Sequence, residues 1–153
     1  MELTDIDNAH DFVTRHSHPF CYGCYKRVHS TIDDDGIEHA VCPTCGSDDL
    51  MRIVDGVGVE YGDEWVLEHF VKESIEKVDS DELYTECLKE CYVETIIICG
   101  QEYDTIDTFK NIDPIAYRCG LLDYESALIS EGDYIEIDNN LYRVADIENY
   151  LET

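Results

Sequence analysis

Two Cys-x-x-Cys pairs constrain this chain more than any other feature of its sequence. The first pair is Cys21 and Cys24, the second is Cys42 and Cys45, and seventeen residues lie between the pairs. Each pair can form a tight turn, here called a knuckle, that directs two sulfurs at one metal ion. Two knuckles at this separation are typical of a four-thiolate zinc site. Such a site has no open coordination position, so its metal stabilises a fold and does not catalyse.

The segment between the two pairs predicts a β-hairpin. Residues 25–32 are rich in β-branched side chains and lead outward, the turn Asp33-Asp34-Asp35-Gly36 follows, and residues 37–41 return. Gly36 supplies the positive φ that a turn requires, and Gly46 does the same after the second pair. Residues 48–54 then predict a third strand.

Residues 19–54 resemble the zinc ribbon, a fold group defined by two such knuckles joined by a hairpin. The resemblance covers about a quarter of the chain. It implies a structural Zn(II) ion held by Cys21, Cys24, Cys42 and Cys45. It implies no particular activity, because zinc ribbons occur in transcription, translation, replication and purely structural settings.

Two other interpretations of these cysteines are two disulfides or one redox-active dithiol. A redox Cys-x-x-Cys usually begins a helix after a strand, whereas Cys24 leads into an alternating, β-branched run. The sequence shows no secretory signal, which predicts a reducing cytoplasmic compartment where disulfides are rare. Spacing and context together therefore favour zinc.

The charge is the second informative feature. The chain carries 36 acidic and ten basic residues, a net charge of −26. Residues 1–14 carry −4, residues 15–54 carry −2, and residues 55–153 carry −20. Charge at this density repels nucleic-acid phosphate and attracts basic protein surfaces. Solubility and adaptation to high intracellular salt are alternative reasons for the acidity, although fifteen isoleucines against five alanines are unusual for the latter.

Beyond the ribbon, the pattern predicts an acidic α+β domain with the element order α-α-β-α-β-β-α. Its helices begin at Asp63, Asp79 and Asp113-Pro114, each an acidic N-cap signal. The overall fold class is therefore α+β, an N-terminal zinc ribbon followed by a small acidic α+β domain. The predicted organisation is an acidic segment at 1–18, the ribbon at 19–55, a turn or linker, and the α+β domain at 62–153.

The remaining candidate groups predict no catalytic site. Cys87 and Cys91 stand one helical turn apart, so they either contribute to a second metal site or pack as small apolar side chains. The chain lacks the nucleophile elbow, the phosphate-binding loop and the His-Glu-x-x-His motif. We therefore expect no enzyme activity, with a thiol or metal-dependent enzyme as an alternative.

These features predict a non-enzymatic, zinc-binding interaction or regulatory protein. Its acidic domain would bind a basic, nucleic-acid-binding protein, as a nucleic-acid mimic or inhibitor, in a style that suits a phage or mobile-element protein in the host cytoplasm. No apolar run has membrane-spanning length, so no membrane partner is expected. The alternative is a zinc-ribbon component of a transcription, replication or translation complex, which would contact nucleic acid through Arg15, Lys26, Arg27, His29 and Arg52.

Overall fold

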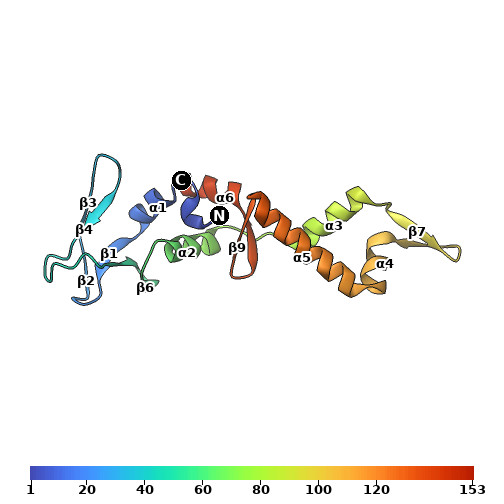
Figure 1. Ribbon diagram of the computed structural model, residues 1–153, viewed down its shortest axis with the longest axis horizontal. Helices are drawn as coiled ribbons and strands as arrows, with labels where there is room; N and C mark the ends of the chain where they lie inside the picture. The colour runs from blue at the N-terminus through green and yellow to red at the C-terminus, as the bar shows by residue number, and fades with distance from the viewer. The chain divides into compact units, whose positions relative to one another are not determined.

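The chain forms two units that each combine helices with small antiparallel sheets (Figure 1). A computed structural model describes all 153 residues and confirms the α+β class. Unit 1 contains residues 1–76 and 144–153, and unit 2 contains residues 77–143. None of the helices combines the length and the apolar character that crossing a membrane would require.

Unit 1 contains four helical segments and six strands. Strands β2, β1, β5 and β6 form an antiparallel sheet in that order, and β3 pairs with β4 in a separate hairpin. The predicted outward strand is thus broken into two, since its first part pairs with β1 and only its second part belongs to the hairpin. The elements are η1 (Leu3–Asp5), α1 (Ala9–His16), β1 (His18–Cys21), β2 (Lys26–Arg27), β3 (Ser30–Ile32), β4 (Glu38–Ala40), β5 (Met51–Val54), β6 (Gly58–Glu60), α2 (Glu64–Ser74) and α6 (Val144–Glu152).

The core of unit 1 lies among its helices. Phe12 and Val13 on α1 are buried, as the spacing of the apolar residues in this segment predicts, and Leu67 on α2 is only 1% exposed. Ile147 and Leu151, one turn apart on α6, are fully buried. Each such side chain contributes about 1.5–3 kcal/mol when it leaves water. All of the largest fully buried side chains of the protein belong to this unit.

Unit 2 is built from local elements with clear sequence signals. Helix α5 begins at Pro114, and the side chain of the preceding Asp113 accepts a hydrogen bond from the Ala116 amide. The helix stops before Gly132, whose φ is +85°. These start and stop signals confirm the predicted helix. Asp79 and Asp104 cap α3 and α4 in the same way. The elements are α3 (Ser80–Cys91), β7 (Thr95–Ile98), β8 (Gln101–Asp104), α4 (Thr105–Ile112), α5 (Pro114–Glu131), β9 (Tyr134–Ile137) and β10 (Asn140–Arg143).

Two local predictions differ from the structure. Residues 101–112, to which the predicted element order assigns neither a strand nor a helix, form the strand β8 and the two-turn helix α4. Residues 58–60, expected to lie in a linker, form β6 and pair with β5. The predicted order from residue 63 therefore lacks one strand and one helix.

The two units group the chain differently from the predicted ranges. The segment 1–18 belongs to unit 1, where Leu3 and Ile6 are buried, and residues 62–153 contribute to both units. The ranges 1–18, 19–55 and 62–153 remain predictions as domains. One consequence concerns charge: unit 1 has twenty acidic and five basic residues, a net −15, and unit 2 has sixteen and five, a net −11.

Candidate metal centre

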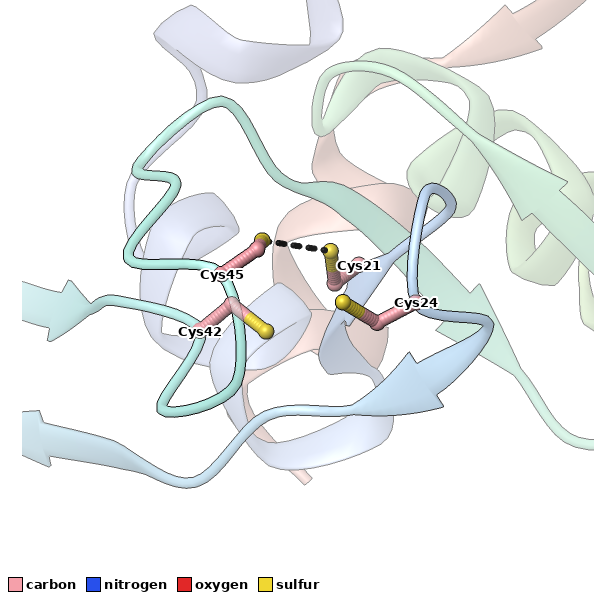
Figure 2. Close-up of side chains that lie close together, drawn as sticks. All are labelled: Cys21, Cys24, Cys42 and Cys45. Atoms are coloured by element: carbon pink, nitrogen blue, oxygen red, sulfur yellow. Dashed lines mark hydrogen bonds between the residues drawn. The ribbon is translucent and has the colours of Figure 1, made fainter.

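The two predicted knuckles bring four sulfurs together in unit 1. Cys21 ends β1 and Cys24 lies in the turn that follows, whereas Cys42 and Cys45 lie in the loop between β4 and β5. The four Sγ atoms all lie within 4.8 Å of one another, and this group can hold a metal ion. Figure 2 shows the two pairs on opposite sides of a common space, with their sulfurs directed into it.

Backbone geometry explains why each pair turns back on itself. In the second knuckle the Cys42 amide donates to the Ser47 carbonyl at 2.9 Å, and the Gly46 amide donates to the Cys42 carbonyl at 2.8 Å. Gly46 has φ of +74°, as its position after the pair predicts. Tyr25 follows the first pair with φ of +55°, a value that non-glycine residues rarely adopt. Both knuckles thus end in a left-handed residue, and only the glycine was visible as a signal in the sequence.

Apolar packing surrounds part of the cysteine group. Cys21 and Cys42 are buried with Val28 in a small apolar cluster, and Cys24, Ala40 and Leu50 are partly buried against it. Cys45 is exposed. The centre therefore has a buried side and a solvent side, which gives an ion a path to the sulfurs.

The four thiols have strongly divergent proton affinities. Hydrogen bonds from the backbone amides of Cys45 and Thr44 lower the pKa of the Cys42 thiol to about 6. A hydrogen bond with the Cys45 thiol, followed by burial, raises the pKa of Cys24 to about 12. The Cys24 amide lowers the pKa of Cys21, but burial and hydrogen bonds with Cys45 and Cys42 outweigh it and raise that pKa.

This electrostatic pattern suits a cation. Without one, a thiolate on Cys42 is stabilised by backbone amides and disfavours a second negative charge on its neighbours. A divalent ion would supply the missing positive charge, and its binding would release the remaining thiol protons. Zinc–sulfur bonds of about 2.3 Å place tetrahedral sulfurs about 3.8 Å apart, and the Cys21 and Cys45 sulfurs lie 3.7 Å apart.

The other cysteines form no comparable group. All eight cysteines are free thiols, and no other set of three or more Cys, His, Asp or Glu side chains converges on a possible ion. Burial is the main cause that raises the pKa of Cys87, with Cys91 next to it adding to the effect. Cys87 and Cys91 thus lack the further convergent side chains that a metal site would need, whereas Cys21, Cys24, Cys42 and Cys45 form a complete set of four.

Arg52, predicted as a phosphate contact in the alternative function, lies inside unit 1. Its Nη1 contacts the Glu38 Oε2 at 2.5 Å, and the two side chains are 11% and 7% exposed. Its Nε donates to the Ser17 hydroxyl at 2.6 Å, and its Nη2 donates to the backbone carbonyls of Val13 and Ser17. Arg52 thus joins β5 to β4 and to the end of α1, and a contact with phosphate would require this network to break.

The other four predicted phosphate contacts lie at the surface without forming one cluster of free cations. Arg15 donates to the Leu151 carbonyl at 3.1 Å, and Arg27 is paired with Asp55. Lys26 reaches the Thr44 hydroxyl at 3.5 Å, beside the second knuckle. His29 is exposed. Their role in binding nucleic acid remains a prediction.

Comparisons with known proteins add no relative to this description. No protein-family model, no curated protein and no solved structure matches the chain. The functional conclusion therefore rests on the sulfur cluster, the charge and the packing of the chain itself.

Proposed function

We propose that this protein is a non-enzymatic interaction protein, stabilised by a structural zinc ion and directed by its acidity to a basic partner. The observation that carries the proposal is the convergence of Cys21, Cys24, Cys42 and Cys45 within 4.8 Å on two knuckles of a zinc-ribbon-like hairpin. Four thiolates select zinc or iron over harder ions, and the amide-stabilised knuckles suit zinc in a structural role.

The nature of the partner follows from the carboxylates. Outside residues 15–54 the chain has 30 acidic and six basic residues. A surface of this composition raises the encounter rate with cationic proteins and repels phosphate. The sharpest form of the proposal is nucleic-acid mimicry, in which the acidic surface occupies a groove that otherwise holds DNA or RNA.

Several tyrosines extend this argument from attraction to contact. Tyr92 and Tyr103 in unit 2 and Tyr61 in unit 1 are strongly exposed among carboxylates. Tyrosine supplies rigid apolar contact area with a polar end and is enriched where protein interfaces are strongest. An acidic surface with exposed phenol rings can therefore present negative charge and flat apolar surface together.

The test is a binding experiment with and without competing DNA. The zinc-loaded protein is immobilised and offered a purified basic DNA-binding protein at low and at high salt, and then challenged with duplex DNA. The proposal expects capture at low salt, loss at high salt, and displacement by DNA. Direct binding of DNA by the protein itself, or equal capture of neutral proteins, would contradict it.

Charge-neutralised variants make this test specific. The triple variant Glu82→Gln, Glu86→Gln and Glu90→Gln removes three exposed charges from α3. The matched control Asp34→Asn, Asp35→Asn and Asp48→Asn removes three exposed charges from the near-neutral hairpin region. We expect the α3 variant to weaken capture more than the control.

A further inference from the structure

Unit 2 contains an apolar pocket between α3, β7 and α4. Its volume is about 430 Å³, and its lining is dominated by aliphatic and aromatic side chains. The polar lining is confined mainly to two threonine hydroxyls and two phenols, and the Thr105 hydroxyl has no hydrogen-bond partner in the chain. The apolar part of the lining includes Tyr84, Leu88, Tyr92, Ile106, Phe109 and Ile112.

The walls of the pocket are held in place by packing within unit 2. The Tyr84 ring packs against the Tyr117 and Tyr124 rings of α5, with centroids 5.3 and 5.5 Å apart. Gly120 of α5 permits this, because a Cβ there would overlap the Tyr84 hydroxyl. The Phe109 ring also packs against α5, through an edge contact with the Tyr117 ring at a centroid distance of 6.0 Å. The pocket is thus a formed feature of the unit and not a gap between loose side chains.

The mouth of the pocket continues into exposed apolar surface. Tyr92 is 65% exposed and Ile112 is 73% exposed, although both line the pocket. Val93, which follows Tyr92 in the chain, is also strongly exposed. Apolar patches that surround a concave site on a soluble domain commonly mark a binding surface.

The charge around the pocket decides which occupant fits. Residues 80–112, which form its walls, carry eight acidic and two basic side chains. Lys110 is one of the two basic residues. Its Nζ lies 3.7 Å from the Asp81 Oδ2 and above the Tyr117 ring, so its charge is paired within the unit. A second copy of this chain would bring two acidic rims together and be repelled. A partner that combines apolar anchors with flanking Lys or Arg is complementary on both counts.

We propose that this pocket binds a basic amphipathic helix of the partner protein. Apolar side chains at helical spacing would enter the pocket, and Lys or Arg on the flanks would meet the carboxylates of α3 and α4. The exposed Tyr92 ring offers a further contact for a cationic side chain through cation–π attraction. This inference rests on the proposed function, since it specifies how the basic partner is held.

The experiment uses the zinc-loaded 153-residue chain and three synthetic fluorescent peptides. The first peptide, of about 18 residues, places leucines at helical spacing among lysines. The second has the same composition in scrambled order, and the third is oligolysine of the same length. Binding is measured by fluorescence anisotropy at low salt, and the contact surface is mapped by amide NMR shifts.

Two exposed isoleucines provide the matched pair of variants. Ile112 lines the pocket, whereas Ile115, which is 76% exposed, does not. We expect the patterned peptide to bind about tenfold tighter than the scrambled one, with Ile112→Gln removing most of that difference and Ile115→Gln changing it less than about twofold. If Ile112→Gln disturbs the fold, as checked by circular dichroism, a second pair gives the same contrast: Tyr92→Ala against Leu122→Ala, since Leu122 is an exposed residue of α5 that does not line the pocket.

The outcomes separate this inference from the proposed function. Equal affinity for the patterned and scrambled peptides, or equal effects of the two isoleucine variants, would overturn the pocket as the docking site. If oligolysine still bound in that case, the proposal that the acidic surface attracts a basic partner would stand. Failure of all three peptides to bind would overturn both. A dimer in sedimentation equilibrium that Ile112→Gln dissociates would also overturn the inference, because the occupant would then be a second copy.

Discussion

Units 1 and 2 carry a similar density of negative charge but are held together in different ways. In unit 1, long-range contacts dominate: a buried core among the helices, the Arg52–Glu38 pair and four convergent thiols. In unit 2, three helices begin with aspartates that accept backbone hydrogen bonds, and few side chains are deeply buried. Neither Asn8 nor Asp63, the N-caps of α1 and α2 in unit 1, makes a side-chain cap bond.

This contrast indicates a division of labour. Both units expose large apolar side chains, but all of the largest fully buried side chains lie in unit 1, so unit 2 has the thinner core. Ile97, Ile112 and Ile115 of unit 2 are each more than 70% exposed. Such a surface is costly in isolation and is compensated when a partner covers it. In the proposed function, unit 1 therefore supplies most of the stability and unit 2 supplies the surface that binds the partner.

The largest expected effect is the loss of a sulfur from the metal centre. We expect Cys42→Ser to remove the amide protection of β1 and β5 while leaving α5 protected, because the serine hydroxyl is a poor zinc ligand and the knuckles depend on the metal. Hydrogen exchange measured by mass spectrometry follows both units in one sample. The control Cys119→Ser changes an exposed cysteine of unit 2. Equal changes in amide protection in the two variants would contradict the claim that unit 1 depends on the metal centre and unit 2 does not.

The next largest effect concerns the buried ion pair. We expect Arg52→Met to lower the free energy of unfolding of unit 1 by about 3–5 kcal/mol, because it leaves the Glu38 carboxylate buried without its partner. The double variant Arg52→Met with Glu38→Leu removes both charges and should recover much of that loss. Chemical denaturation at saturating zinc measures both. A double variant as unstable as Arg52→Met alone would mean that the other contacts of Arg52 dominate.

A smaller effect is expected at the helix caps of unit 2. We expect Asp113→Ala to cost about 0.5–2 kcal/mol, because the Ala116 amide loses its acceptor at the start of α5. Asp113→Asn retains a capping oxygen and should cost much less. Thermal unfolding followed by circular dichroism compares the two. No difference between them would show that α5 depends on packing, as the helices of unit 1 do.

The smallest expected effect lies at the tip of the hairpin in unit 1. The pKa of Asp33 is held below its usual value of 3.8 by a hydrogen bond with His39, and by the Ile37 and Asp35 amides. The stabilisation is therefore present above pH 3.8 and is lost as the pH falls through the folded-state pKa. We expect His39→Gln to raise the pKa of Asp33 toward 3.8, as measured by carbon NMR of its carboxyl group. An unchanged pKa would assign the effect to the two amides.

Sequence reasoning succeeded where the determining signal is local. Asp113-Pro114 predicts the start of α5, and the Cys-x-x-Cys pairs with Gly46 predict the sulfur cluster, because a few adjacent residues decide the backbone in each case. The β7–β8 hairpin was missed because its two-residue turn is Cys99-Gly100. Cys99 adopts a φ of +52° there, and a cysteine is not a residue type that predicts positive φ. Asp104, followed by Ile106 and Phe109, was the signal that could have predicted α4.

The burial of Arg52 could not be read from the sequence. Its partners Ser17 and Glu38 lie 35 and 14 residues away, and only the folding of α1, β4 and β5 against one another brings them together. The same holds for the grouping of residues 144–153 with unit 1, since α6 packs its apolar face there after the chain has completed unit 2. Long-range packing and not local propensity sets both features.

The most direct measurement is the metal content and coordination of the purified protein. Elemental analysis combined with X-ray absorption at the metal edge reports the ion, its stoichiometry and its ligands. The account predicts one zinc ion per chain, bound by four sulfurs at about 2.3 Å. Protein that folds normally without zinc, or whose metal has nitrogen or oxygen ligands in place of a cysteine sulfur, would contradict it.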